Sequence, residues 1–300
     1  MGKRVLLAVN PRARTGVEAY GRAAAALRER GHTIVEVSLD GSSQALSAAI
    51  RAHRDDVDAV VVGGGDGTLL RALRGLVETK LPLAILPLGT FNELARTLGV
   101  PNDPAEVAAL LDDGVPVAID VGCVNGVYYL NEASIGLSTQ VARLQTSDVK
   151  RAFGMFAIPV TTLRALRWVR PLHLAIRLED GTTKDVRTVQ LTVANSYRFG
   201  GVVENPEGSL GDGKLWLFAI DVHGWWSALR VIGSVVLRRF QHSPDVATLR
   251  GTRFTVRSLH RGKHRVFADG EYVTRLPAEF SIAHGGVTVL VPAPRVAAIR

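Results

Sequence analysis

Short apolar runs alternate with amphipathic stretches over the first 121 residues. The apolar runs are rich in valine, leucine, isoleucine and alanine, are bounded by turn residues, and cover residues 5–9, 33–38, 60–62, 83–88 and 115–121. The stretches between them have apolar positions at helical spacing, most clearly at residues 17–30, 69–76 and 105–111. Strands that alternate with helices in this order are typical of a doubly wound parallel sheet. We therefore predict an α/β domain over residues 1–121.

The pattern changes after residue 121. Short alternating runs separated by turn residues follow at residues 127–131, 172–178, 188–194, 214–220, 253–258, 265–268 and 279–282. Many short strands at this spacing favour an antiparallel β-sandwich. We therefore assign residues 122–286 to a second domain of this architecture.

Two helical stretches interrupt the β pattern, at residues 153–169 and 224–240. In the second, one stripe of the helix is apolar and carries Trp225, Leu229, Ile232 and Val236. The stretch ends in Arg238 and Arg239, and an apolar stripe with a basic rim suits an anionic bilayer or an acyl-chain cleft. A helix of this pattern more often covers one face of a sheet, and we take that as the default. Peripheral membrane contact stays open.

Composition narrows the choice of partner. The chain has 300 residues, 47% of them apolar, and a formal net charge of +8, which favours an anionic partner such as a nucleotide or an acidic membrane. The basic residues are scattered and do not interleave with aromatic residues, so a nucleic-acid partner is disfavoured. The only cysteine, Cys123, excludes an internal disulfide. Without a signal peptide pattern or a membrane-spanning run, we expect a cytoplasmic protein, for which a homodimer stays open.

The strand at residues 60–62 ends in Gly63-Gly64-Gly65-Asp66-Gly67-Thr68. Glycines let backbone amides approach a phosphate, and the expected helix start at Leu69 adds the positive end of a helix dipole. Asp66 would repel phosphate unless a Mg²⁺ ion lay between them. Thr68 can cap the helix or bond a phosphate oxygen. The run lacks the P-loop ending and the dinucleotide spacing, so alone it predicts either a tight turn or a polyphosphate site.

The Gly-Gly-Asp-Gly-Thr run resembles the signature of the diacylglycerol kinase catalytic domain, which is shared with sphingosine and ceramide kinases and, more distantly, with NAD kinases. The segment Gly89-Thr90-Phe91-Asn92, followed by Ala95-Arg96, and the Asn10-Pro11 loop are similar to the same family, although Glu93 departs from its commoner residue. The resemblance implies that these loops bind ATP. The expected contacts are Asn10, Pro11, Arg12, Ala13, Arg14, Gly64, Gly65, Asp66, Gly67, Thr68, Thr90 and Asn92.

The second domain resembles the family in the same order along the chain. The matching segments are residues 131–137, Asn195, Gly200-Gly201, Pro206, Asp212-Gly213-Lys214-Leu215 and Asp269-Gly270-Glu271. An Asp-Gly pair between strands is by itself a hairpin turn, here one expected to project both acids together. The resemblance implies that Glu271 is the general base, that Asp66 is a further catalytic acid, and that Asp269 orients Glu271 or holds a metal. It also implies a Mg²⁺ site at Asp212 with the backbone carbonyls of Ser209 and Lys214.

The resemblance covers nearly the whole chain and implies a lipid kinase that uses ATP and Mg²⁺. Its substrate would be the free hydroxyl of diacylglycerol or a related lipid, with a role in phospholipid biosynthesis. The family also implies that residues 287–300 return to the first domain and that the acids of the two domains face one cleft. Two alternatives remain. An NAD kinase-like enzyme is disfavoured by the second-domain segments, and a catalytically silent lipid-binding regulatory protein is disfavoured because both Asp66 and Glu271 are present.

Overall fold

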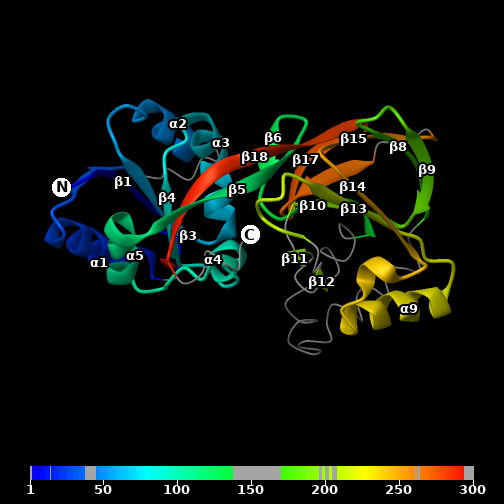
Figure 1. The fold of residues 1–300 in the computed structure, drawn as a ribbon, viewed down its shortest axis with the longest axis horizontal. Coiled ribbons are helices and arrows are strands. Elements are labelled where there is room, and N and C mark those ends of the chain that lie inside the picture. Colours follow the sequence, from blue (N-terminus) through cyan, green and yellow to red (C-terminus); the bar gives the residue numbers. More distant parts are fainter. Residues whose placement is uncertain are drawn as a thin grey trace. The chain divides into compact units, whose positions relative to one another are not determined.

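The computed structural model describes residues 2–13, 15–37, 45–137, 170–195, 198–199, 203–204, 208–260, 262 and 264–293. The chain forms two compact units, which are Met1–Val121 with Ala283–Arg300 (unit 1) and Gly122–Ile282 (unit 2). Strands β5 (Val115–Val124) and β18 (Ala278–Val291) each contribute residues to both units (Figure 1). The predicted helix at residues 153–169, and Arg14, Gly200, Gly201 and Pro206, lie outside the described residues.

Unit 1 is built on parallel strands in the order β2-β1-β3-β4-β18. The four strands not yet bounded are β1 (Arg4–Val9), β2 (Thr33–Glu36), β3 (Ala59–Gly64) and β4 (Leu83–Pro87). The chain leaves β1 toward β2 on one side and leaves β3 toward β4 on the other. The carboxyl ends of β1 and β3 therefore flank a topological switch point, where open α/β sheets bind ligands.

The helices of unit 1 complete a doubly wound domain, as predicted. They are α1 (Gly16–Glu29), α2 (Ala45–Ala52), α3 (Asp66–Thr79), α4 (Glu93–Leu98) and α5 (Pro104–Asp113). Helix α1 packs with α5, and α2 packs with α3, on opposite sides of the strands (Figure 1). Every residue of β3 and β4 is buried between these layers, which explains why both strands are continuous apolar runs.

Unit 2 is the predicted β-sandwich. One sheet has six strands in the order β14-β13-β10-β7-β16-β17, and the other contains β18-β15-β8-β9 with β5 and β6. The strands are β6 (Val127–Tyr129), β7 (Glu132–Gly136), β8 (Leu172–Leu178), β9 (Thr183–Thr188), β10 (Gln190–Ala194), β11 (Arg198–Phe199), β12 (Val203–Glu204), β13 (Leu215–Ile220), β14 (Val246–Gly251), β15 (Arg253–Ser258), β16 (Arg265–Ala268) and β17 (Glu271–Arg275). Their inward side chains form one core that includes Tyr129, Phe254 and Phe280.

Two details of unit 2 differ from the sequence prediction. The strand expected at residues 279–282 is the start of a longer strand, β18, which pairs antiparallel with β15 at its start and parallel with β4 near its end. Helix α9 (Trp225–Val236) is followed by a 3₁₀ turn, Phe240–His242. No helix among the described residues is both long enough and apolar enough to cross a membrane.

Candidate functional site

The glycine loop of unit 1 is shorter than the sequence predicts. Strand β3 continues through Gly64 and helix α3 begins at Asp66, three residues before the expected start at Leu69. Gly65 alone lies between them, in an extended conformation, and is the N-cap of α3. Asp66 and Gly67 are therefore the first helical residues, and their amides have no partner within the helix. Together with the helix dipole, these amides suit a phosphate group.

Two glycines bring the loops after β3 and β4 into contact. A Cβ atom on Gly89 would lie 2.5 Å from the Cα of Gly65 and 2.7 Å from Oδ1 of Asn92, closer than real Cβ atoms approach other atoms. The amide of Leu88 also donates to the carbonyl of Gly64 at 2.9 Å. The two loops therefore form one continuous backbone surface, and a side chain at residue 89 would push them apart.

Asp66 fixes the second of these loops. Its Oδ1 accepts a 2.9 Å hydrogen bond from the amide of Glu93, the first residue of α4. Asn92 closes the same turn, because its Oδ1 accepts from the amide of Gly89 at 2.9 Å and its Nδ2 donates to the carbonyl of Gly89 at 2.8 Å. Oδ2 of Asp66 accepts no hydrogen bond from the residues that the structure describes. One carboxylate oxygen is thus structural, and the other can bind a cation.

Asn10 and Thr68 connect the loops on the two sides of the switch point. Nδ2 of Asn10 donates to Oγ1 of Thr68 at 3.2 Å, and the amide of Asn10 donates to the carbonyl of Gly63 at 2.8 Å. Thr68 is buried and its side chain does not cap α3, so the capping alternative is wrong. The remaining predicted nucleotide contacts lie on the same loops, with exposed Pro11, Arg12 and Thr90 and half-buried Ala13.

In unit 2, strand ends bring several polar residues to one end of the six-stranded sheet. In the register of this sheet, Ala268 of β16 lies opposite Glu271 of β17 on one side and Ala133 of β7 on the other. Ala194 of β10 lies between Glu132 of β7 and Trp216 of β13, and Trp216 in turn lies opposite Arg250 of β14. Four strand steps separate β17, which begins at Glu271, from β13, which Asp212 precedes. At about 4.8 Å per step, these two strands lie about 19 Å apart across the sheet.

Asp269 holds the turn between β16 and β17. Its carboxylate accepts hydrogen bonds from the amides of Leu130 at 2.6 Å, Asn131 at 2.9 Å and Glu132 at 3.1 Å. Asp269 and Gly270 have φ of 45° and 85°, the left-handed pair that a two-residue hairpin turn requires. The expectation that the turn projects both acids together is wrong, because the Asp269 carboxylate is bonded to the backbone of residues 130–132.

The same region contains a fully buried tyrosine. Burial, and to a smaller extent the charge of Asp269, raise the pKa of the Tyr129 hydroxyl well above its ordinary value. Tyr129 therefore stays neutral and packs as a core residue beside the segment that Asp269 binds. Asn195, which directly follows β10, supports this segment, since its amide donates to the carbonyl of Asn131 at 2.8 Å and its Nδ2 donates to the carbonyl of Leu130 at 2.9 Å.

Glu271 contrasts with Asp269, two residues away. It is the first residue of β17, its backbone is paired with Ala268, and its side chain is exposed. Among the described residues, its carboxylate has no hydrogen-bond or ion-pair partner, and it makes no contact with Asp269 that would orient it. The hairpin therefore presents an uncommitted carboxylate to solvent from a backbone that Asp269 fixes.

Asp212, the side chain expected to bind Mg²⁺ in unit 2, does not fit a bound cation as it lies. Oδ1 of Asp212 accepts from the amide of Lys214 and Oδ2 accepts from Arg250, both at 2.9 Å. The Arg250 guanidinium also lies 5.1 Å from the ring centroid of Trp216, and its charge opposes a metal ion at Asp212. Ser209 accepts through its hydroxyl from Gly211 at 3.3 Å. In the described part of the chain, no three His, Cys, Asp or Glu residues are grouped to hold a metal.

Sequence reasoning missed Arg250 and the amides of residues 130–132. Arg250 lies on β14, a partly polar strand that was not recognised, and its register with β13 places it opposite Trp216. The amides that bind Asp269 carry no sequence signal, since any residue supplies an amide. Both contacts depend on strand pairing over long separations along the chain.

Comparisons with known proteins identify the family. Residues 4–124 match the diacylglycerol kinase catalytic domain, and residues 131–291 match the YegS C-terminal NAD kinase beta sandwich-like domain. The chain therefore belongs to the diacylglycerol kinase family, and the resemblance found in the sequence is confirmed. It is 30% identical over 284 residues to a diacylglycerol kinase of Mycobacterium tuberculosis (strain CDC 1551 / Oshkosh), covering 92% of this chain and 90% of that protein.

Two further comparisons agree. The chain is 29% identical over 258 residues to a diacylglycerol kinase of Bacillus subtilis (strain 168), covering 84% of this chain and 82% of that protein. A crystal structure of a diacylglycerol kinase from Bacillus anthracis str. Sterne has a TM-score of 0.76 over 98% of both chains, at 24% identity. That likeness supports the fold, an α/β domain followed by a β-sandwich.

Proposed function

We propose that the protein is an ATP-dependent lipid kinase that phosphorylates the free hydroxyl of diacylglycerol or a closely related lipid, with Glu271 as general base. The observation that carries the proposal is the state of Glu271. Its carboxylate is exposed, has no partner among the described residues and sits on a fixed hairpin. The relatives that match most of this chain are diacylglycerol kinases.

In this proposal unit 1 binds the nucleotide and unit 2 binds the lipid. The phosphates of ATP lie against the amides of Asp66 and Gly67, at the carboxyl ends of β1, β3 and β4, where the loops containing Asn10, Thr68, Thr90 and Asn92 supply further polar groups. Oδ2 of Asp66 fits one ligand position of a Mg²⁺ ion, which typically keeps several waters and is otherwise held by phosphates. When bound, the ion neutralises phosphate charge.

The proposed reaction is a direct phosphoryl transfer. The Glu271 carboxylate takes the proton of the lipid hydroxyl while the hydroxyl oxygen bonds to the γ-phosphorus of ATP. The bond from that phosphorus to the bridging oxygen of the β-phosphate breaks, and ADP leaves. Asp269 exchanges no proton and keeps the Glu271 backbone in place. The meeting of the two acid-bearing turns stays a prediction of this mechanism. The Mg²⁺ site expected at Ser209, Asp212 and Lys214 is a separate prediction that would require Arg250 to release Asp212, and no step of the mechanism passes through it.

The substrate class is tested with the full chain and MgATP. Diacylglycerol, phosphatidylglycerol, sphingosine, ceramide and NAD are offered separately, and products are measured by mass. We expect a mass gain of one phosphate on diacylglycerol, which would support a role in phospholipid metabolism. Phosphorylation of NAD alone would replace the proposal with the NAD kinase alternative, and no product from any substrate would favour a silent lipid-binding protein.

The base is tested by Glu271→Gln, which keeps the shape and removes the proton acceptor. We expect kcat to fall by about 10²–10⁴, the usual contribution of a general base. ATP affinity, measured by calorimetry, should stay within about twofold of wild type because Glu271 is assigned to the lipid and not to the nucleotide. Glu18→Gln, at an exposed position on α1, is the matched control. Full turnover in Glu271→Gln would exclude this residue as the base.

A further inference from the structure

Helix α9 is apolar on two faces, and only one of them is buried. Ser227 and Ala228 are buried, and Val231 and Val235 pack against a cluster on the six-stranded sheet that includes Trp216, Phe218 and Phe240. The stripe identified in the sequence lies on the other side. This second face comprises Trp225 and Trp226, exposed by 61% and 68%, with Leu229 at 37%, Val236 at 76% and the following Leu237 at 70%.

This exposed face concentrates apolar surface that is scattered elsewhere. Of ten large hydrophobic side chains exposed among the described residues, five lie between Trp225 and Leu237. The two indole rings are neighbours, with centroids 4.9 Å apart. Single exposed hydrophobic residues are ordinary on a protein surface, whereas a contiguous patch of this kind marks an interaction site.

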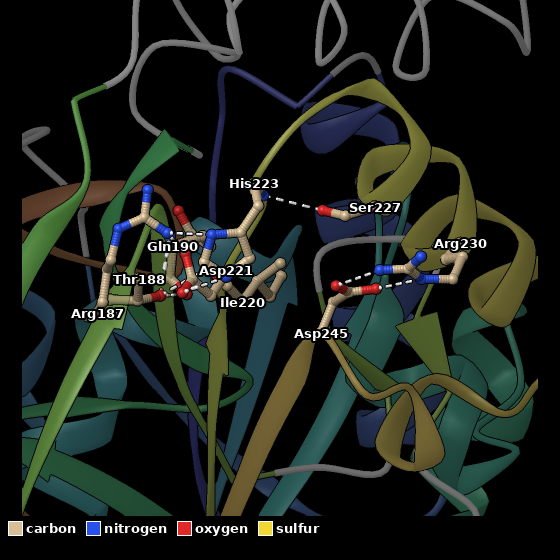
Figure 2. Close-up of polar contacts among 9 residues, drawn as sticks. All are labelled: Arg187, Thr188, Gln190, Ile220, Asp221, His223, Ser227, Arg230 and Asp245. Atoms are coloured by element: carbon tan, nitrogen blue, oxygen red, sulfur yellow. Dashed lines mark hydrogen bonds and ion pairs between the residues drawn. The ribbon is translucent and has the colours of Figure 1, made fainter.

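Polar contacts hold α9 to unit 2, so the patch is not the result of a loose helix (Figure 2). Ser227 accepts a 3.0 Å hydrogen bond from the amide of His223 at the start of the helix. In the middle, Arg230 donates from Nε and Nη2 to the two carboxylate oxygens of buried Asp245, each at 2.9 Å. Arg187 holds the segment before the helix, because its Nη1 lies 2.6 Å from Oδ1 of Asp221 and 2.8 Å from Nδ1 of His223. The exposed indoles therefore project from a fixed helix.

The segment that carries the patch contains basic residues and no acidic ones. No Asp or Glu occurs between Asp221 and Asp245, a span that contains Arg230, Arg238 and Arg239. Arg230 is neutralised by Asp245, and Arg238 and Arg239 are exposed at the end of the helix. A second copy of the chain would bring a patch with cations and no acid against itself in a two-fold contact. An anionic lipid surface supplies both the apolar layer and the missing negative charge.

We infer that the exposed face of α9 is a membrane-docking surface that inserts Trp225 and Trp226 into the interfacial layer of an anionic bilayer. Indole rings favour that layer because they present an apolar body and a polar N–H group. Leu229, Val236 and Leu237 would extend the inserted surface, with Arg238 and Arg239 at the lipid phosphates. The inference rests on the proposed lipid substrate for its biological purpose, and docking itself requires neither ATP nor Glu271.

Docking is tested by sedimentation of the full chain with vesicles, without nucleotide. The vesicles contain phosphatidylcholine alone or mixed with phosphatidylglycerol. We expect binding to the mixed vesicles and weak binding to phosphatidylcholine. The Trp225→Ser/Trp226→Ser variant should bind about tenfold more weakly or worse, because it loses two large apolar contacts. Arg238→Gln/Arg239→Gln should lose about fivefold per arginine at low salt, a difference that disappears at high salt. Val17→Ser/Leu259→Ser, at exposed apolar positions that are not part of α9, should bind like wild type.

Indole fluorescence gives an independent measurement of insertion. The chain has four tryptophans, two of them in the patch, so vesicles with brominated acyl chains should quench the wild type and leave Trp225→Ser/Trp226→Ser largely unquenched. Equal quenching of both proteins would overturn the inference. So would wild-type binding in the double variant, or an absence of wild-type binding to mixed vesicles. A wild-type dimer that this variant converts to a monomer in light scattering would also overturn it, by assigning the face to a second copy.

Failure of the docking inference can be distinguished by experiment from failure of the proposed function. If α9 does not dock to membranes but the protein is a lipid kinase, Trp225→Ser/Trp226→Ser phosphorylates lipid in vesicles and in detergent micelles as well as wild type does. If α9 docks but the protein is not a lipid kinase, the wild type binds mixed vesicles and produces no phosphorylated lipid in vesicles or in micelles. If both are right, the double variant keeps its rate in micelles and loses it in vesicles.

Discussion

The loop at residues 64–68 of unit 1 and the turn at residues 269–271 of unit 2 contain similar residues and use them differently. In unit 1, the side chains of Asp66 and Thr68 contact neighbouring loops, and the groups left for a ligand are mainly backbone amides at the start of α3. In unit 2, backbone amides bind the side chain of Asp269, and the group left for a ligand is the carboxylate of Glu271.

The difference teaches how to separate an anchoring acid from a reactive one. Asp269 accepts three hydrogen bonds from backbone amides, so protonating it or binding it to a metal would leave those amides unpaired. Glu271 accepts none from the described residues, so its lone pairs can take a substrate proton. Asp66 is intermediate, with one oxygen committed to Glu93. Unit 2 thus depends on one strongly bonded carboxylate, whereas unit 1 depends on several weaker contacts.

The largest stability effect should come from Asp269→Ala. Hydrogen bonds to a charged group contribute about 1.5–3 kcal/mol each but are not additive, so we expect the free energy of unfolding to fall by about 3–5 kcal/mol. Urea unfolding measures the change. Asp180→Ala is the matched control, because Asp180-Gly181 is also an Asp-Gly turn, and the exposed Asp180 carboxylate accepts from the nearby amide of Thr182 at 2.8 Å.

The contrast between the loop at residues 64–68 and the turn at residues 269–271 is wrong if Asp269→Ala and Asp180→Ala lose similar unfolding free energy. In that case the three bonds to residues 130–132 would contribute little, and Asp269 would be available for a chemical role. The Asp269→Asn variant sharpens the result, because it keeps one acceptor oxygen and removes the charge. We expect it to fall between wild type and Asp269→Ala in the same unfolding measurement.

Among the changes proposed for the loops after β3 and β4, Gly89→Ala should lose the most stability. The new Cβ would meet the Cα of Gly65 at 2.5 Å, and forced overpacking of this kind costs about 1–3 kcal/mol of unfolding free energy. Gly67→Ala is the informative partner, since a Cβ there meets no heavy atom within 4 Å. We expect Gly67→Ala to leave thermal unfolding unchanged and to weaken ATP binding in calorimetry, because the methyl group would occupy the position proposed for a phosphate. Unchanged ATP affinity would remove Gly67 from the site.

A smaller effect is expected at Asp66, where anchoring and cation binding can be separated. Asp66→Asn keeps an oxygen that can accept from Glu93 and removes the charge, so stability should change little while the Mg²⁺ dependence of ATP affinity weakens. Asp66→Ala removes both, and loss of a helix-terminal acceptor costs about 0.5–2 kcal/mol of unfolding free energy. Equal ATP affinity with and without Mg²⁺ in wild type would exclude the proposed cation at Oδ2.

The sequence predicted the elements better than the contacts between them. The α/β pattern of residues 1–121 and the sandwich strands at residues 172–178, 253–258 and 265–268 follow from local apolar periodicity, which burial of strands and helices imposes directly. The polar strand β9 lacks that periodicity because half of its side chains are exposed. Strand β18 was not recognised over its full length, because His284, Gly285 and Gly286 interrupt its apolar pattern.

In the candidate site, too, the sequence predicted residues with a local structural meaning and missed contacts between residues far apart in the chain. The loop residues of unit 1 were identified because glycines after a strand have a local structural meaning. The anchoring role of Asp269 was not, because its partners lie 137–139 residues earlier in the chain. In α9, one apolar stripe was recognised, but a sequence cannot state which of two apolar faces meets the sheet. That choice is made by Val231 and Val235, which pack on the cluster around Phe218.

The smallest predicted effect concerns the contact between Asn10 and Thr68, and it tests whether unit 1 really depends on several weak bonds. Asn10→Ala removes the 3.2 Å bond to Thr68 together with the 3.0 Å bond from the amide of Arg12, so the single variant overstates the contact. Thr68→Val removes the hydroxyl alone. A double-mutant cycle cancels the Arg12 contribution and should give a coupling of about 0.5–1.5 kcal/mol in unfolding free energy, the net worth of one neutral hydrogen bond. A coupling well above that range would mean that unit 1, like unit 2, relies on one dominant contact.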